Sequence, residues 1–187
     1  MLFRNSMLIN SLLSSSETLY NVQNKHIDKL ESCDKDLMVR LFSVPHTCSY
    51  ESIYLETGCL PIRFIIQGRR LMYLWTLLNK SENELVKKVF DTQKQFPSKN
   101  DWIMTINEDL KSLDIDLSEE TIKKMKKQAF KKLIKQKIKE KSTEFLFNLK
   151  DNENRSKSKK LNSYSFQNYL LTDKLNTCLL YTSPSPR

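Results

Sequence analysis

Glycine is almost absent from this chain: the 187 residues include only Gly58 and Gly68. Tight hairpins and β-bulges depend on glycine because it adopts positive φ angles without strain. Rossmann and Walker-type phosphate loops need several glycines at fixed spacing. The scarcity therefore favours an all-α fold and excludes both of these nucleotide-binding loops.

The chain also lacks the paired cysteines of a metal site or a disulfide framework. Its four cysteines, Cys33, Cys48, Cys59 and Cys178, show no C-x-x-C spacing, which is typical of free thiols in a reducing compartment. His46 and Cys48 are close in sequence, but structural zinc normally draws two such pairs. We predict no metal site, no cofactor and no small-molecule substrate.

Long apolar runs are missing too. No stretch reaches the roughly 20 apolar residues that a membrane-spanning helix requires, and polar residues interrupt the apolar N-terminal segment. We therefore predict an intracellular protein that does not bind membranes.

What the chain does have is a strong local excess of positive charge. Residues 1–120 hold 14 Lys and Arg against 17 Asp and Glu, whereas residues 121–160 hold 15 against 4. The net charge of +9 therefore arises in one segment, which suits a polyanionic partner such as nucleic acid.

Apolar periodicity and capping residues predict a series of helices. The expected ranges are 24–43, 50–56, 61–78, 81–94, a helix after Asp101, and a long helix from Ser118 to about Asn148. Expected caps are Ser49, Gly58, Asp101 and Ser118, with Pro61 in a first turn and a capping box formed by Ser81 and Glu84. Together they predict an irregular helical bundle with a long basic C-terminal helix.

Two of these helices carry expected buried faces. In the 24–43 helix we expect Ile27, Leu30, Leu37 and Leu41 to lie on one face. In the long basic helix the expected apolar stripe comprises Ile122, Met125, Ala129, Leu133, Ile138 and Phe145. Trp75 and Trp102 offer flat surfaces on which bases stack, but their place within apolar runs favours the core.

The lysines of the last helix are the strongest candidates for binding. Ten lysines fall within residues 123–141, with Glu140 as the only acid. The residues that we select are Lys123, Lys124, Lys126, Lys127, Lys131, Lys132 and Lys135. Like charges at this density repel each other along a helix, which favours a polyanion partner. A solvated charged face is the alternative.

Four blocks, in order, resemble the region that follows the polymerase core in LINE-type (non-LTR) retrotransposon reverse transcriptases. They read LYNVQNKHIDKLESCDKDLMVRLFSVP, YLETGCLPIRFIIQGRRLMYLWTLL, DWIMTINEDL and IKKMKKQAFKKLIKQKIKEK. The resemblance covers about Ser11 to Leu175. It implies a thumb-like helical region whose Arg63, Arg69 and Arg70 grip phosphates of a template and primer. The alternative is that these arginines pair with carboxylates of the chain, such as Glu51 or Glu56.

The same resemblance implies a non-catalytic fragment. Reverse transcriptases hold two metal ions with an Asp-Asp hairpin, and no Asp-Asp pair occurs here. The parent polyprotein would be an RNA-directed DNA polymerase, and the fragment would help to hold RNA template or target DNA during target-primed reverse transcription. Its partners would be the backbone of RNA or DNA, without sequence specificity, and the remaining polyprotein domains, in the nucleus and cytoplasm. The alternative is a small host helical protein whose basic helix binds an acidic protein.

We expect five segments along the chain. Residues 1–117 form a helical core bundle, 118–150 the long basic helix and 151–163 a flexible linker. Residues 164–177 form a short helix of a truncated continuation. The last ten residues, 178–187, read CLLYTSPSPR and resemble a translated sequencing adapter, so they are left out of the fold.

Overall fold

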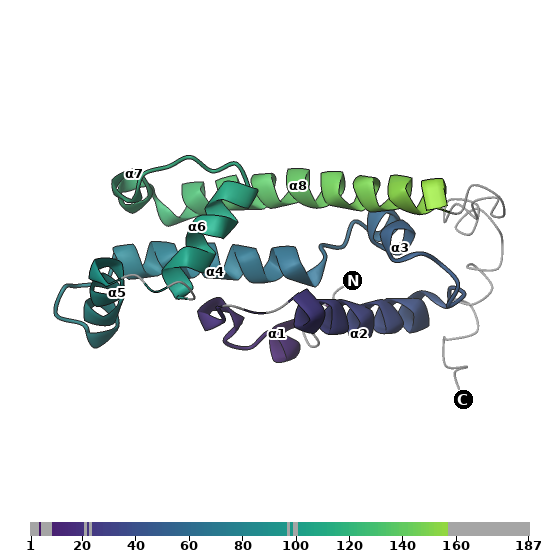
Figure 1. The fold of residues 1–187 in the computed structure, drawn as a ribbon, viewed down its shortest axis with the longest axis horizontal. Helices are drawn as coiled ribbons and strands as arrows, with labels where there is room; N and C mark the ends of the chain where they lie inside the picture. Colours follow the sequence, from purple (N-terminus) through teal and green to yellow (C-terminus); the bar gives the residue numbers. More distant parts are fainter. Residues whose placement is uncertain are drawn as a thin grey trace, which may run out of the picture. The chain divides into compact units, whose positions relative to one another are not determined.

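Helices form all of the regular structure in the described part of the chain. The structure is a computed structural model that describes residues 4, 9–20, 22, 24–96, 98 and 101–156, with side chains as far as residue 150. Within these residues there are eight α-helices, a 3-10 turn and no strand (Figure 1), which confirms the all-α prediction. The elements are α1 (Ile9–Leu12), η2 (Ser16–Thr18), α2 (Asn24–Phe42), α3 (Tyr50–Thr57), α4 (Ile62–Leu78), α5 (Leu85–Gln95), α6 (Trp102–Ser112), α7 (Glu119–Lys124) and α8 (Lys127–Ser156).

Most helix ends lie where their capping residues predict. Ser49, Asp101 and Ser118 each accept the backbone N–H of the residue three positions later, at 2.8 to 3.3 Å. These bonds satisfy an N–H that the first turn of a helix otherwise leaves without a partner. Gly58 ends α3 with a left-handed φ of 63°, as a C-terminal glycine is expected to do.

The capping box at Ser81 forms only in part. The Glu84 carboxylate accepts the Ser81 backbone N–H at 3.3 Å, but α5 begins at Leu85 and Glu84 is its N-cap. The prediction of a helix start at Ser81 was therefore wrong by about one turn. The Glu84 carboxylate also pairs with Lys80 at 2.6 Å, and this hydrogen bond lowers its pKa.

Asp101 provides a first test of local stability. Its carboxylate accepts the N–H groups of Met104 at 2.8 Å and Ser98 at 2.9 Å, and these bonds, that of Met104 first, lower the pKa of Asp101. We expect Asp101→Ala to lower the free energy of unfolding at neutral pH by about 1–2 kcal/mol. A depressed folded-state pKa stabilises the fold above the unfolded-state pKa, and this contribution is lost as the pH falls through the folded-state value. Urea unfolding over a pH series should therefore show the two proteins converging in acid; a difference that grows in acid would contradict this assignment.

Contacts divide the described residues into two compact units. Unit 1 contains those up to Cys33 and from Leu60 to Ser142, and unit 2 contains those from Asp34 to Cys59 and from Thr143 onward. Two of the three boundaries therefore fall inside helices, α2 and α8, and the third lies in the loop between α3 and α4.

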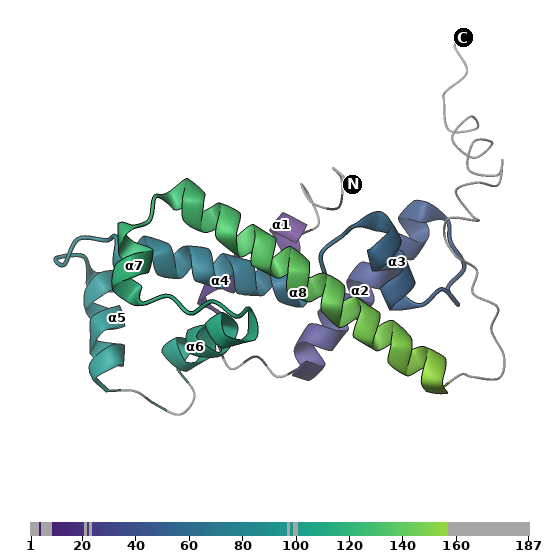
Figure 2. The same cartoon turned by 90° about the horizontal axis from the view of Figure 1, so that it is seen from above.

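The core of unit 1 is built around α4. This helix packs against η2, α5, α6 and α7, and it buries Ile62, Ile66, Leu71 and Leu74 among others. The first half of α8 runs beside α4 in both views (Figures 1 and 2). At Gly68 a Cβ atom would lie 2.8 Å from Ile138 Cδ1, so the missing side chain permits this approach.

Unit 2 has its own small core. Its buried residues are Met38, Val39, Val44, Ile53, Tyr54, Cys59 and Leu146. The Asp34 carboxylate is fully buried among them and accepts a hydrogen bond from the Tyr54 hydroxyl.

The expected buried face of α2 was wrong in part: Ile27, Leu30 and Leu37 are half-buried, and Leu30 packs against the core of unit 1. Leu41 is 45% exposed, whereas Glu31, Asp34, Met38 and Val39 are the buried positions of the helix. Two acids lie on this face because each has a partner elsewhere in its own unit: Asp34 bonds to Tyr54, and Glu31 bonds to an arginine of α4. A count of apolar residues cannot identify such a face.

The last helix extends further than expected. α8 continues through Ser156, so the linker predicted from residue 151 does not begin there; the segment 151–156 is polar but contains no proline or glycine to end a helix. The rest of the predicted linker, the short helix at 164–177 and the adapter-like residues 178–187 lie outside the described residues. Among the helices that the structure describes, none combines the length and the apolar character needed to cross a membrane.

Candidate nucleic-acid interface

The basic segment consists of two helices, not one. The sequence predicts a single helix from Ser118 to about Asn148, but α7 ends at Lys124 and α8 begins at Lys127. Met125 between them has extended backbone angles, φ −71° and ψ 139°. The prediction of an unbroken helix was therefore wrong.

Trp75 on α4 accounts for the break. Its indole N–H donates to the Met125 carbonyl oxygen at 3.0 Å. In an unbroken helix this carbonyl would instead accept the backbone N–H four residues later. The Lys127 ammonium lies 5.8 Å from the centre of the same ring, within the range of a cation–π contact. Trp75 is half-buried, so it belongs partly to the core, as expected, and also positions the start of α8.

This role of Trp75 leads to a second prediction. Trp75→Phe keeps most of the ring but removes the N–H, and we expect a loss of about 1 kcal/mol in the free energy of unfolding, typical of one hydrogen bond. Hydrogen exchange should become faster at the first hydrogen-bonded amides of α8, beginning at Phe130. Trp102→Phe is the matched control, because the Trp102 N–H donates at 2.9 Å to the Glu17 carbonyl, away from the break. Equal acceleration in both variants would contradict the role of Trp75.

The break also changes which side of α8 is buried. The buried residues are Phe130, Ile134, Ile138, Ser142 and Leu146, spaced by four positions. The expected stripe was therefore wrong in part: Ile122 and Ile138 are buried, Met125, Leu133 and Phe145 are half-buried, and Ala129 is exposed. The predicted stripe follows the periodicity of one continuous helix. The two non-helical residues between α7 and α8 change the face on which each later residue lies.

The seven selected lysines all lie on the outside. Their side chains are exposed to solvent, and we call this set the lysine face: Lys123, Lys124, Lys126, Lys127, Lys131, Lys132 and Lys135. Within the described residues six of them make no ion pair or hydrogen bond through the side chain, and the seventh, Lys127, lies over Trp75. Lys137 and Lys141 differ, because they are half-buried and pair with Glu140 at 3.7 Å and Asp114 at 2.6 Å.

The electrostatics of the lysine face are one-sided. No acid occurs in the sequence between Glu120 and Glu140, and the first turn of α8 contains none. The partial positive charge of a helix N-terminus therefore adds to the lysines and is not offset locally. Lys127, Lys131 and Lys135 follow each other at intervals of four, which places like charges on adjacent turns of α8. An anion bound there relieves this repulsion.

The three arginines are bonded within the chain. Arg63 pairs with Glu31 at 2.7 Å and with Asp28 at 3.1 Å. Arg69 donates to the Leu13 carbonyl and, at 3.0 Å, to Asn10 Oδ1. Arg63 matches the alternative of pairing with carboxylates, although its partners are not Glu51 and Glu56. The partners of Arg69 are uncharged oxygens.

Arg70 is buried and therefore does not belong to the candidate interface. It is 6% exposed and makes a two-pronged ion pair with Asp109 on α6, at 2.6 and 2.8 Å. Burial raises the pKa of Asp109, while the Arg70 guanidinium opposes that rise. A guanidinium enclosed in this way cannot reach a phosphate without opening unit 1, so its selection as a phosphate contact was wrong.

Trp102 is buried, as expected for a core residue. It is 6% exposed, and its ring meets Tyr73 and Phe90 edge to face, with centroids 5.7 and 6.2 Å apart.

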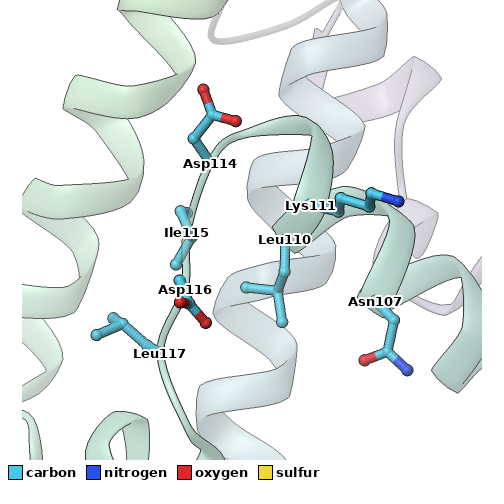
Figure 3. A pocket seen from close by; sticks show the side chains of 7 residues that line it. All are labelled: Asn107, Leu110, Lys111, Asp114, Ile115, Asp116 and Leu117. Atoms are coloured by element: carbon cyan, nitrogen blue, oxygen red, sulfur yellow. The ribbon is translucent and has the colours of Figure 1, made fainter.

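Two hollows mark the surface of unit 1. One, of about 390 Å³, follows the loop after α6 and is lined by Asn107, Leu110, Lys111, Asp114, Ile115, Asp116 and Leu117 (Figure 3). Its two carboxylates make it a poor site for phosphate. The other, of about 330 Å³, lies beside α4 and includes Lys127 of the lysine face.

The described residues contain no cluster of three or more side chains suited to hold a metal ion. Cys33, Cys48 and Cys59 are free thiols, and burial raises the pKa of Cys48.

Comparisons of the chain with protein-family models, with curated proteins and with solved structures found no match. The structure therefore identifies no family. It shows an all-α fold with an exposed lysine face on α7, α8 and the residues between them.

Proposed function

We propose that this chain is a non-catalytic, post-polymerase fragment of a LINE-type reverse transcriptase that helps to hold RNA template or target DNA. The observation that carries the nucleic-acid part of this proposal is the lysine face. It presents seven ammonium groups without carboxylate partners among the described residues, and a nucleic-acid backbone supplies closely spaced negative charges that release counterions when lysines bind.

The way α8 is held supports the same proposal. Phe130, Ile134 and Ile138 are each at most 4% exposed, so one side of the helix is anchored while the lysines face outward. A rigid row of cations binds a regular polyanion at a smaller entropic cost than a flexible basic tail does. Contacts of this kind read phosphates and not bases, so we propose binding without sequence preference.

Lysine reactivity measured by mass spectrometry tests this assignment on the full chain. A short duplex, RNA or DNA, should protect Lys131, Lys132 and Lys135 from acetylation. Lys25 and Lys29 on α2 are exposed lysines without a side-chain partner in the described structure, so they serve as internal controls and should react at the same rate with and without the duplex.

Uniform protection of all five lysines would contradict a defined interface. An absence of protection by nucleic acid, together with protection by an acidic protein domain, would instead favour the host interaction protein as the function.

A further inference from the structure

The hollow beside α4 offers a different chemistry from the lysine face next to it. Its lining residues are Glu17, Arg69, Met72, Tyr73, Thr76 and Lys127, and its volume is about 330 Å³. We name it the α4 hollow. It is a shallow depression that is open to solvent, so it can hold a single small unit against the surface but cannot enclose a length of duplex.

The walls of the α4 hollow are held by contacts within unit 1. The Glu17 carbonyl accepts the Trp102 indole N–H at 2.9 Å, and the Tyr73 ring meets Trp102 edge to face. The Arg69 guanidinium is fixed by Leu13 and Asn10. A hollow with positioned walls binds its ligand at a lower ordering cost than a flexible surface does.

Charged residues of both signs line the hollow, and this restricts the class of ligand that it can bind. Lys127 and Arg69 attract an anion, and the bonds of Arg69 to Leu13 and Asn10 use only two of its five N–H donors. A bare phosphate would be repelled by the Glu17 carboxylate in the same hollow. A ligand that carries both an anionic group and N–H donors can pair with Lys127, Arg69 and Glu17 together. A carboxylate accepts well from the exocyclic amine of a base.

We propose that the α4 hollow receives one unpaired nucleotide at the end of a bound strand. The phosphate lies toward Lys127 and Arg69, the edge of the base donates to Glu17, and the face of the base lies against Met72 and Tyr73. Unpaired bases are the ones that side chains can contact by stacking and along their pairing edge. The inference rests on the proposed function, because Lys127 belongs both to the hollow and to the lysine face.

The test compares two labelled duplexes by fluorescence anisotropy, one blunt and one with a short single-stranded adenine overhang. We expect the full chain to bind the overhang duplex about fivefold more tightly or better, the equivalent of one base contact. Glu17→Ala removes the acceptor and should bring this ratio to one. The Glu17 side chain is half-buried, and the indole of Trp102 bonds to the backbone carbonyl of Glu17, so the substitution leaves this hydrogen bond in place.

Glu120→Ala is the matched control, because it removes the same side-chain charge and acceptor from an exposed site on α7 outside the hollow. It should change the affinity for both duplexes by the same factor and preserve the ratio. A ratio of one in the unmodified chain, or a ratio that Glu17→Ala leaves unchanged, would overturn the inference.

The experiment distinguishes a failure of the proposed function from a failure of the α4 hollow assignment. If neither duplex binds at low salt, the proposed function fails; if both bind equally, only the α4 hollow assignment fails. Free adenosine monophosphate, at the concentration of the overhang duplex, should leave the preference intact. Loss of the preference would show a site for free nucleotides and would overturn the strand-end assignment.

Discussion

Charge reversal of Lys131, Lys132 and Lys135 should weaken binding to a short duplex by about 100-fold or more at low salt. These three residues are exposed on α8 and have no side-chain partner in the described structure, so their replacement by glutamate removes attraction without breaking a contact of the fold. Each lost phosphate contact on B-DNA also reduces the slope of log affinity against log salt by about 0.9. Fluorescence anisotropy over a salt series measures both effects.

A matched variant separates the lysine face from net charge. Reversal of Lys25, Lys29 and Lys88 changes the total charge by the same amount at exposed positions on α2 and α5. We expect it to lower the affinity by less than about tenfold, since its effect is only long-range and screened by salt. Equal losses in the two variants would mean that binding follows total charge and that the lysine face is not the interface. Unchanged circular dichroism in both confirms that folding is intact.

Removal of the Asp109 carboxylate should destabilise unit 1 more than any other change proposed here. Asp109→Ala leaves the buried Arg70 guanidinium without its ionic partner, and loss of one member of a buried pair costs about 3–5 kcal/mol. Urea unfolding followed by tryptophan fluorescence reports this loss, because Trp75 and Trp102 both lie in unit 1.

The double variant Arg70→Met and Asp109→Leu tests whether the cost comes from the unpaired charge. Apolar residues of similar volume often replace a buried ion pair with little loss, so we expect the double variant to recover most of the stability. Asp28→Ala is a useful comparison, because it removes only the outer, 61% exposed partner of Arg63 and leaves the bond between Arg63 and Glu31 in place. A cost below about 1 kcal/mol for Asp109→Ala would contradict a structural role for the pair, since that is the range of exposed ion pairs.

Local features of the fold were predictable from the sequence because their causes are local. Ser49, Asp101 and Ser118 bond to a backbone N–H only three residues away, and Gly58 ends α3 through its own φ angle. The outward position of the lysines follows from their density, since no protein core can bury so many ammonium groups without carboxylates.

The features that prediction missed depend on residues distant in sequence. Trp75 reaches the Met125 carbonyl across 50 positions, and nothing near Met125 marks the end of a helix there. Arg70 meets Asp109 across 39 positions, and Arg63 meets Glu31 across 32. Charged residues at helical spacing within apolar runs, such as Arg70 and Asp109, are the one sequence signal that points to such buried pairs.

The most direct test of the central claim is a salt titration of the unmodified chain with a short duplex. If the lysine face binds the nucleic-acid backbone, log affinity should fall linearly with log salt, with a slope between about −3.6 and −6.3 for four to seven phosphate contacts on B-DNA. Duplexes of unrelated sequence should give the same slope. Binding that does not change with salt, or no binding at low salt, would contradict the claim that this surface holds nucleic acid.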